Sequence, residues 1–176
     1  MRSLAILSSA CGLQRWRSGQ YRSSLKQYRS SLKRLAALIR SLAGTGFEDR
    51  RDMAIARLFL NTGARLEEMS QLRLEVVSLQ HRELYVMGKG RKARVLPLGA
   101  KAVKDLDRYL RVRERHKEGH LPWLWLSSKG RLTSSGIAQM IKRRCKAAGI
   151  PAVHPHQFRH TPSRIYGWSG VETSTT

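Results

Sequence analysis

Three short runs of alternating apolar and polar residues lie in the middle of this chain, between segments with helical periodicity. The apolar positions are Val77, Leu79, Leu84, Val86 and the stretch from Val95 to Leu98. A period of two predicts half-buried strands, and the polar residues at 80–82 and 88–92 predict tight turns between them. We therefore expect a three-stranded antiparallel meander.

Helical segments precede and follow the predicted meander. Two acidic residues after Phe47 suit the start of a helix, Asn61–Gly63 suits its end, and a second short helix is expected from Leu66. After the strands, residues 99–116 and a segment that Thr133 or Ser134 caps have the same periodicity. Their apolar faces are Val103, Leu106 and Leu110, and then Ile137, Met140, Ile141, Cys145 and Ala148. The expected fold class is α+β, mainly helical.

The net charge narrows the class of partner. The 176 residues hold 34 Lys and Arg against 12 Asp and Glu, a formal charge of +22, and such a chain suits a polyphosphate such as nucleic acid. A hydrophobic content of 41% allows a core, which excludes a wholly disordered basic tail. No apolar run is long enough to span a membrane, and Cys11 and Cys145 alone provide neither a disulfide framework nor a four-thiolate zinc site.

The charge also suggests how the chain is divided. No acidic residue occurs in residues 1–47, and the heptapeptide QYRSSLK occurs twice in succession there. We predict a basic segment over 1–34, which is a remnant or a linker and can be helical. A main domain follows over 35–165, and a disordered polar tail over 166–176.

Two basic features could bind phosphate. Arg65 opens a predicted helix, where a cation opposes the helix dipole, so it is either a solvent-facing side chain or a functional one. The turn after Gly88 carries Lys89, Arg91, Lys92 and Arg94, which either form a solvated hairpin tip or contact a phosphate backbone. Both alternatives stay open for each feature.

A third cluster lies near the end of the chain, in His154–His160. Pro155 suits the first residue of a helix, which would put His156 and Arg159 one turn apart on the same face, where both can meet one phosphate. His154, His156 and His160, with Cys145 as a further candidate ligand, have no carboxylate or second thiol close by in the sequence, so we expect no metal site.

These segments together resemble the successive motifs of the tyrosine recombinases, or phage-type integrases. The matching segments are Thr62–Met69, Gly88–Lys92 with Val95–Leu98, Pro122–Leu126 and His154–His160, within about residues 35–161. The resemblance implies the catalytic domain of that family, a mainly helical fold with a small three-stranded sheet.

The resemblance also implies roles. Arg65 and Arg159 would hold the non-bridging oxygens of the scissile phosphate, and His156 would assist proton transfer. Lys89 would protonate the departing 5′ oxygen, with Lys92 as the fallback. Such a reaction needs no metal and no other cofactor, because a tyrosine phosphodiester conserves the bond energy.

The sequence departs from the family after Arg159. The family's tyrosine nucleophile lies roughly thirty residues further on, whereas Tyr166 follows by only seven residues and Pro162 interrupts the helix. We therefore assign no nucleophile and expect a catalytic domain that is incomplete at both ends, truncated at its C-terminus and unable to cleave DNA.

The expected partner is double-stranded DNA, with self-association or other recombinase protomers as further partners, no membrane, and a cytoplasmic, nucleoid-associated location in a bacterium. Two alternatives stay open: a non-enzymatic DNA-binding remnant, and a basic RNA-binding protein.

Overall fold

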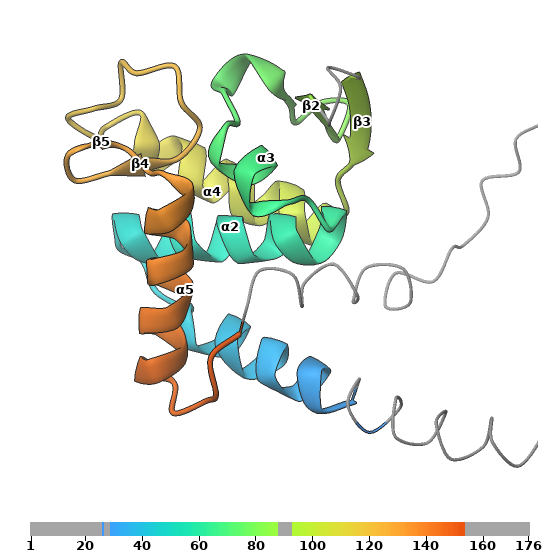
Figure 1. Ribbon diagram of the computed structural model, residues 1–176. Coiled ribbons are helices and arrows are strands. Elements are labelled where there is room, and N and C mark those ends of the chain that lie inside the picture. Colours follow the sequence, from blue (N-terminus) through green and yellow to red (C-terminus); the bar gives the residue numbers. More distant parts are fainter. Residues whose placement is uncertain (1–25, 27–28, 88–92, 154–176) are drawn as a thin grey trace, which may run out of the picture.

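The computed structural model describes residues 26, 29–87 and 93–153 (Figure 1). Residues 29–41 are helical and run across the boundary predicted between 34 and 35, and that division of domains stays a prediction. The labelled elements are α2 (Phe47–Thr62), α3 (Leu66–Ser70), the 3-10 turn η1 (Leu74–Val76), β1 (Val77–Ser78), β2 (Glu83–Met87), β3 (Ala93–Pro97), α4 (Ala100–Arg113), β4 (Leu126–Ser127), β5 (Gly130–Arg131) and α5 (Ser134–Ala147).

The predicted meander is confirmed. The strands pair antiparallel in the order β1-β2-β3, with Leu84 opposite both Val77 and Leu96. Leu84 and Val86 are buried and Tyr85 between them is exposed, as alternation requires. A second hairpin, β4 with β5, was not predicted because two-residue strands have no alternation to recognise.

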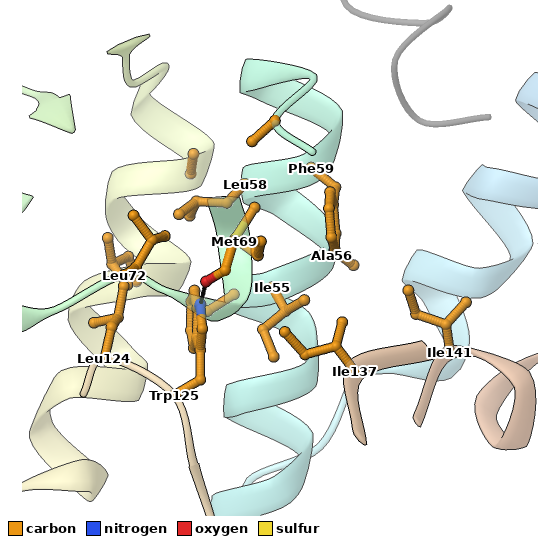
Figure 2. Close-up of a cluster of buried hydrophobic side chains, with 14 of the residues drawn as sticks. Ile55, Ala56, Leu58, Phe59, Met69, Leu72, Leu124, Trp125, Ile137 and Ile141 are labelled. Carbon is orange, nitrogen blue, oxygen red and sulfur yellow. Dashed lines mark hydrogen bonds between the residues drawn. The ribbon is translucent and has the colours of Figure 1, made fainter. Parts of the chain in front are cut away.

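The core surrounds α2 (Figure 2). Ala54, Ile55, Leu58 and Phe59 are all fully buried, because helices and loops cover this helix on several sides. The helix at 29–41 adds Leu35 and Leu38 to the same core, and Leu42 in the following turn joins them. From α5 the core receives Ile137, Met140, Ile141 and Cys145. The predicted apolar face of α5 is confirmed at these four positions, and Thr133 caps the helix by accepting a hydrogen bond from the Gly136 N–H at 3.2 Å.

The face that α4 buries differs from the predicted one. Leu106 is buried as expected, but Val103 and Leu110 are only partly buried, while Tyr109 and Arg113 are enclosed. Hydrogen bonds to the loop after α4 account for this difference. The Tyr109 hydroxyl donates to the Leu124 carbonyl at 2.9 Å, and Arg113 donates to carbonyls of the following loop. These hydrogen bonds rotate α4 so that Tyr109 and Arg113 face the core, although the spacing of its apolar residues alone would place them beside the buried face.

A buried cluster of charges joins α2 to α5. Asp52 is fully buried, and its carboxylate accepts hydrogen bonds from Arg51 Nε at 2.9 Å and Arg144 Nε at 2.7 Å. Arg51 is itself only 3% exposed, and its Nη1 donates to the Leu126 carbonyl. Each buried charge therefore has a partner, as burial in a low-dielectric interior requires.

Within the part of the chain that the structure describes, no helix is long and apolar enough to cross a membrane. The predicted polar tail at 166–176 lies outside the described residues.

Candidate active site

A sharp reversal of the chain between α2 and α3 presents Arg65. Gly63 takes the left-handed conformation (φ 60°), which glycine adopts without a steric penalty, and its N–H donates to the Phe59 carbonyl to end α2. Arg65 then has extended backbone as the N-cap of α3. The predicted helix end and the predicted position of Arg65 at a helix start are both confirmed.

One carboxylate organises this corner. Glu68, three residues into α3, accepts hydrogen bonds from the Arg65 backbone N–H at 2.8 Å and from Arg65 Nη1 at 2.9 Å. Its other contact is Arg94 Nη2 in β3, at 2.6 Å. The Glu68 side chain is 7% exposed, whereas those of Arg65 and Arg94 are 51% and 42% exposed. Glu68 therefore anchors two arginines whose outer parts face solvent.

The pKa of Glu68 is lowered from 4.5. Burial alone would raise this pKa, but the hydrogen bonds from the Arg65 backbone and side chain, together with the charges of Arg94 and Arg65, outweigh burial. The carboxylate is therefore ionised at neutral pH and holds both guanidinium groups.

An open groove of about 840 Å³ adjoins Arg65. Besides Arg65, its lining includes the charged residues Glu67, Glu68, Arg73 and Glu75 and the exposed side chains of Tyr85 and Met87. The groove lies between α3 and β2, so a ligand in it could reach Arg65 from the solvent side.

This arrangement suits an anion. A guanidinium has five N–H donors, and Glu68 uses Nη1 of Arg65 and Nη2 of Arg94, which leaves donors of both side chains for a ligand. Phosphate oxygens match such donors in charge and geometry. No group of three or more His, Cys, Asp or Glu residues is arranged to hold a metal among the residues that the structure covers.

The structure places only part of the predicted site. Arg65 and Arg94 are brought together on one carboxylate, although they are 29 positions apart in the sequence. The remaining predicted residues lie outside the described ones: Lys89, Arg91, Lys92, His156 and Arg159.

Sequence analysis missed Glu68 as the anchor of the site. The available signal was its spacing. An acid three residues after the N-cap of a helix can turn back to the backbone N–H of the N-cap residue, as the Glu of a capping box does.

Known proteins are similar to this chain in sequence and in fold. The chain matches the model of the phage integrase family over residues 29–175, which extends beyond the predicted 35–161 at both ends. It is 37% identical over 144 residues to tyrosine recombinase XerC of Ralstonia pickettii (strain 12J), covering 70% of this chain and 43% of that protein. It is 39% identical over 114 residues to the XerC of Alcanivorax borkumensis, covering 63% and 37%.

Solved structures agree. The crystal structure of XerA recombinase has a TM-score of 0.65 at 30% identity and covers 74% of this chain and 47% of that one. XerH site-specific recombinase bound to its difH substrate has a TM-score of 0.60 at 22% identity, which shows the fold alone. The predicted mainly helical fold with a small three-stranded sheet is confirmed. The chain spans less than half the length of these relatives.

Proposed function

The chain belongs to the phage integrase family, and from that premise we propose that it binds duplex DNA as the catalytic part of a site-specific tyrosine recombinase. The Tn1549 transposon integrase, which shares this fold, has been solved in complex with transposon right end DNA, and that supports DNA as the partner here. A role on DNA also implies a cytoplasmic, nucleoid-associated location in a bacterium.

The observation that carries this proposal is the Glu68 anchor. Arg65 is held by its backbone and by one guanidinium nitrogen, yet half of its side chain remains exposed beside the groove. A cation that is fixed in place and still accessible can stabilise the charge that develops on a phosphate during transfer, without reorganising when the reaction occurs.

The other roles follow the family resemblance. Arg65 and Arg159 would hold the two non-bridging oxygens while a tyrosine oxygen attacks phosphorus. The 5′ oxygen would leave with a proton from Lys89 or Lys92, His156 would assist proton transfer, and Arg91, Lys92 and Arg94 would contact the DNA backbone. We do not assign Tyr166 as the nucleophile, so we expect this chain to hold the scissile phosphate without forming a 3′-phosphotyrosine.

The test has two parts. Fluorescence anisotropy with a labelled duplex compares the wild type with Arg65→Ala, for which we expect a Kd about tenfold higher, or about 1.4 kcal/mol of lost binding. Arg82→Ala is the matched control, because Arg82 is an exposed arginine in the β1–β2 turn that forms no ion pair within the described ranges. Equal effects of the two changes would refute a specific role for Arg65.

The second part incubates the protein with a nicked duplex and scores covalent adducts on a denaturing gel. We expect none. An adduct that Tyr166→Phe abolishes would make Tyr166 the nucleophile and overturn that part of the proposal. Preference for folded RNA over duplex DNA in the same anisotropy assay would favour the RNA-binding alternative.

A further inference from the structure

One exposed face of α4 carries a regular row of cations. Lys101, Lys104, Arg108 and Arg111 follow one another at intervals of three and four residues, which places them on one side of the helix. We call these four residues the basic stripe. All four are exposed, because the opposite side of α4 buries Ala102, Leu106 and Tyr109 against the core.

The charge of the basic stripe is only partly neutralised. Asp105 is 12% exposed and contacts Arg57 at 2.9 Å and Arg108 at 3.6 Å, while Asp107 pairs with Arg111 at 3.0 Å on the open surface. Lys101 and Lys104 form no ion pair in the described part of the chain. Two of the four cations therefore have no ion-pair partner among the described residues, and exposed pairs such as Asp107 with Arg111 are weak.

The first cation of the basic stripe costs the helix some stability, whereas Arg111 in the last turn suits the helix dipole. The N-cap of α4 is Gly99, which makes no side-chain capping bond, and the first turn contains no acid. Lys101 lies in that turn, where a cation opposes the helix dipole. Nothing in the core requires a charge at this position, so its presence points to a ligand outside the chain.

The dimensions suit a phosphate backbone. Arg111 lies ten positions after Lys101, a rise of about 15 Å along an α-helix. One strand of duplex DNA carries a phosphate for roughly every 3.4 Å of axis, so four cations over this length can lie opposite successive phosphates of one strand.

We propose that the basic stripe is a second contact for the phosphate backbone of duplex DNA, formed by residues that have no part in the Arg65 site. The inference rests on the proposed function in taking DNA as the polyanion. It predicts that α4 contributes to affinity and salt dependence without selecting a sequence, because phosphate contacts carry no base information.

The first experiment compares two triple variants with the same loss of charge. The stripe variant is Lys101→Gln, Lys104→Gln and Arg111→Gln. The scattered control is Arg40→Gln, Arg82→Gln and Lys129→Gln, at exposed cations on three other segments, none of them ion-paired among the residues described. For each variant, the Kd for a random-sequence duplex is measured against salt concentration.

We expect the stripe variant to lower the slope of log Kd against log salt by about 2 to 3 units, since each phosphate contact contributes about 0.9. The scattered control should lower it by less than about 1 unit. Lys101→Gln alone should weaken binding without lowering the melting temperature. Equal slopes for the two triple variants would overturn the proposal, because general charge would then explain both.

The second experiment locates the contact. Acetylation of lysines in the intact protein, read by mass spectrometry, should show that duplex DNA protects Lys101 and Lys104 several-fold and Lys129 little. Equal protection by polyglutamate of matched charge would refute the assignment to phosphate. If the stripe variant weakens DNA binding and Arg65→Ala does not, the Arg65 site is rejected and the basic stripe is supported. If Arg65→Ala weakens DNA binding and the stripe variant does not, the basic stripe is rejected and the Arg65 site is supported.

Discussion

Two clusters in this molecule have the same composition and opposite exposure. In the α2–α5 cluster, Asp52 binds Arg51 and Arg144, and in the α3–β3 corner, Glu68 binds Arg65 and Arg94. Both carboxylates are buried. The arginines of the first cluster are 3% and 19% exposed, while those of the second are 51% and 42% exposed.

The difference in exposure distinguishes arginines that hold two helices together from arginines that are available to a ligand. Arg51 donates to Asp52 and to the Leu126 carbonyl and is only 3% exposed, so a ligand cannot reach it. Arg65 makes one side-chain bond to Glu68 and keeps the rest of its guanidinium accessible. A motif search that counts arginines near acids would not distinguish the two, whereas the exposure of the guanidinium does.

The largest loss of unfolding free energy should come from a substitution in the α2–α5 cluster. Asp52→Ala removes the carboxylate that Arg51 and Arg144 share and should cost about 3 to 5 kcal/mol of unfolding free energy, because the buried Arg51 loses its buried counter-charge while Arg144 keeps only Asp49. Urea unfolding measures this cost. Asp107→Ala, which breaks the exposed pair with Arg111, is the control and should cost less than about 1 kcal/mol. Similar costs for the two variants would contradict the distinction between enclosed and exposed pairs.

A smaller effect is expected at the exposed corner. Glu68→Gln should lower the unfolding free energy by about 1 to 2 kcal/mol at neutral pH, since the charge-assisted bonds to Arg65 and Arg94 are lost. The folded-state pKa of Glu68 is below 4.5, so its contribution is complete above that pH and is lost as pH falls through the lower, folded value.

Urea unfolding of Glu68→Gln and of the wild type near pH 7 and near pH 3 checks this sign. The difference between the two proteins should shrink in acid. A difference that is constant or grows in acid would show that Glu68 is not held ionised by its arginines.

The smallest effect concerns His116, which lies beside the enclosed cluster. Its ring stacks on Phe47 with centroids 4.2 Å apart, and its Nδ1 accepts the Glu118 N–H. Burial lowers its pKa below 6.5; Glu118 opposes this shift and the charges of Arg51 and Arg113 add to it. The folded protein therefore binds this proton less readily than the unfolded chain.

The contribution of neutral His116 to the unfolding free energy is therefore fully present above about pH 6.5, and it is lost as the pH falls toward the lower pKa of the folded state. His116→Gln should flatten the dependence of the melting temperature on pH between pH 5 and 7, by a small amount because the ring is only partly buried. An unchanged pH dependence in His116→Gln would contradict the assignment.

Local patterns predicted the parts of the fold that local chemistry decides. The meander follows from alternation at Leu84 and Val86, and the end of α2 follows from Gly63. The burial of Arg51 and Asp52 was not predictable, because it depends on Arg144, which lies more than ninety positions later in the sequence. A charged pair within a helix looks solvent-facing until its distant partner is known.

The site divides in the same way. The position of Arg65 at the start of α3 was predictable from the sequence, since a turn and a helix fix it locally. Its convergence with Arg94 was not, because the pairing of β2 with β3 and the packing of α3 beside them bring the two side chains to Glu68. The roles of Lys89, His156 and Arg159 stay predictions.

Arg113 gives the loop after α4 a property that its own sequence lacks. Its guanidinium donates to the carbonyls of Gly119, Leu121, Trp123 and Leu124. The loop is therefore ordered by a side chain of the last turn of α4. The loop and the end of α4 should therefore open together as one cooperative unit in hydrogen exchange. The amides of the loop should exchange as slowly as those of the last turn of the helix.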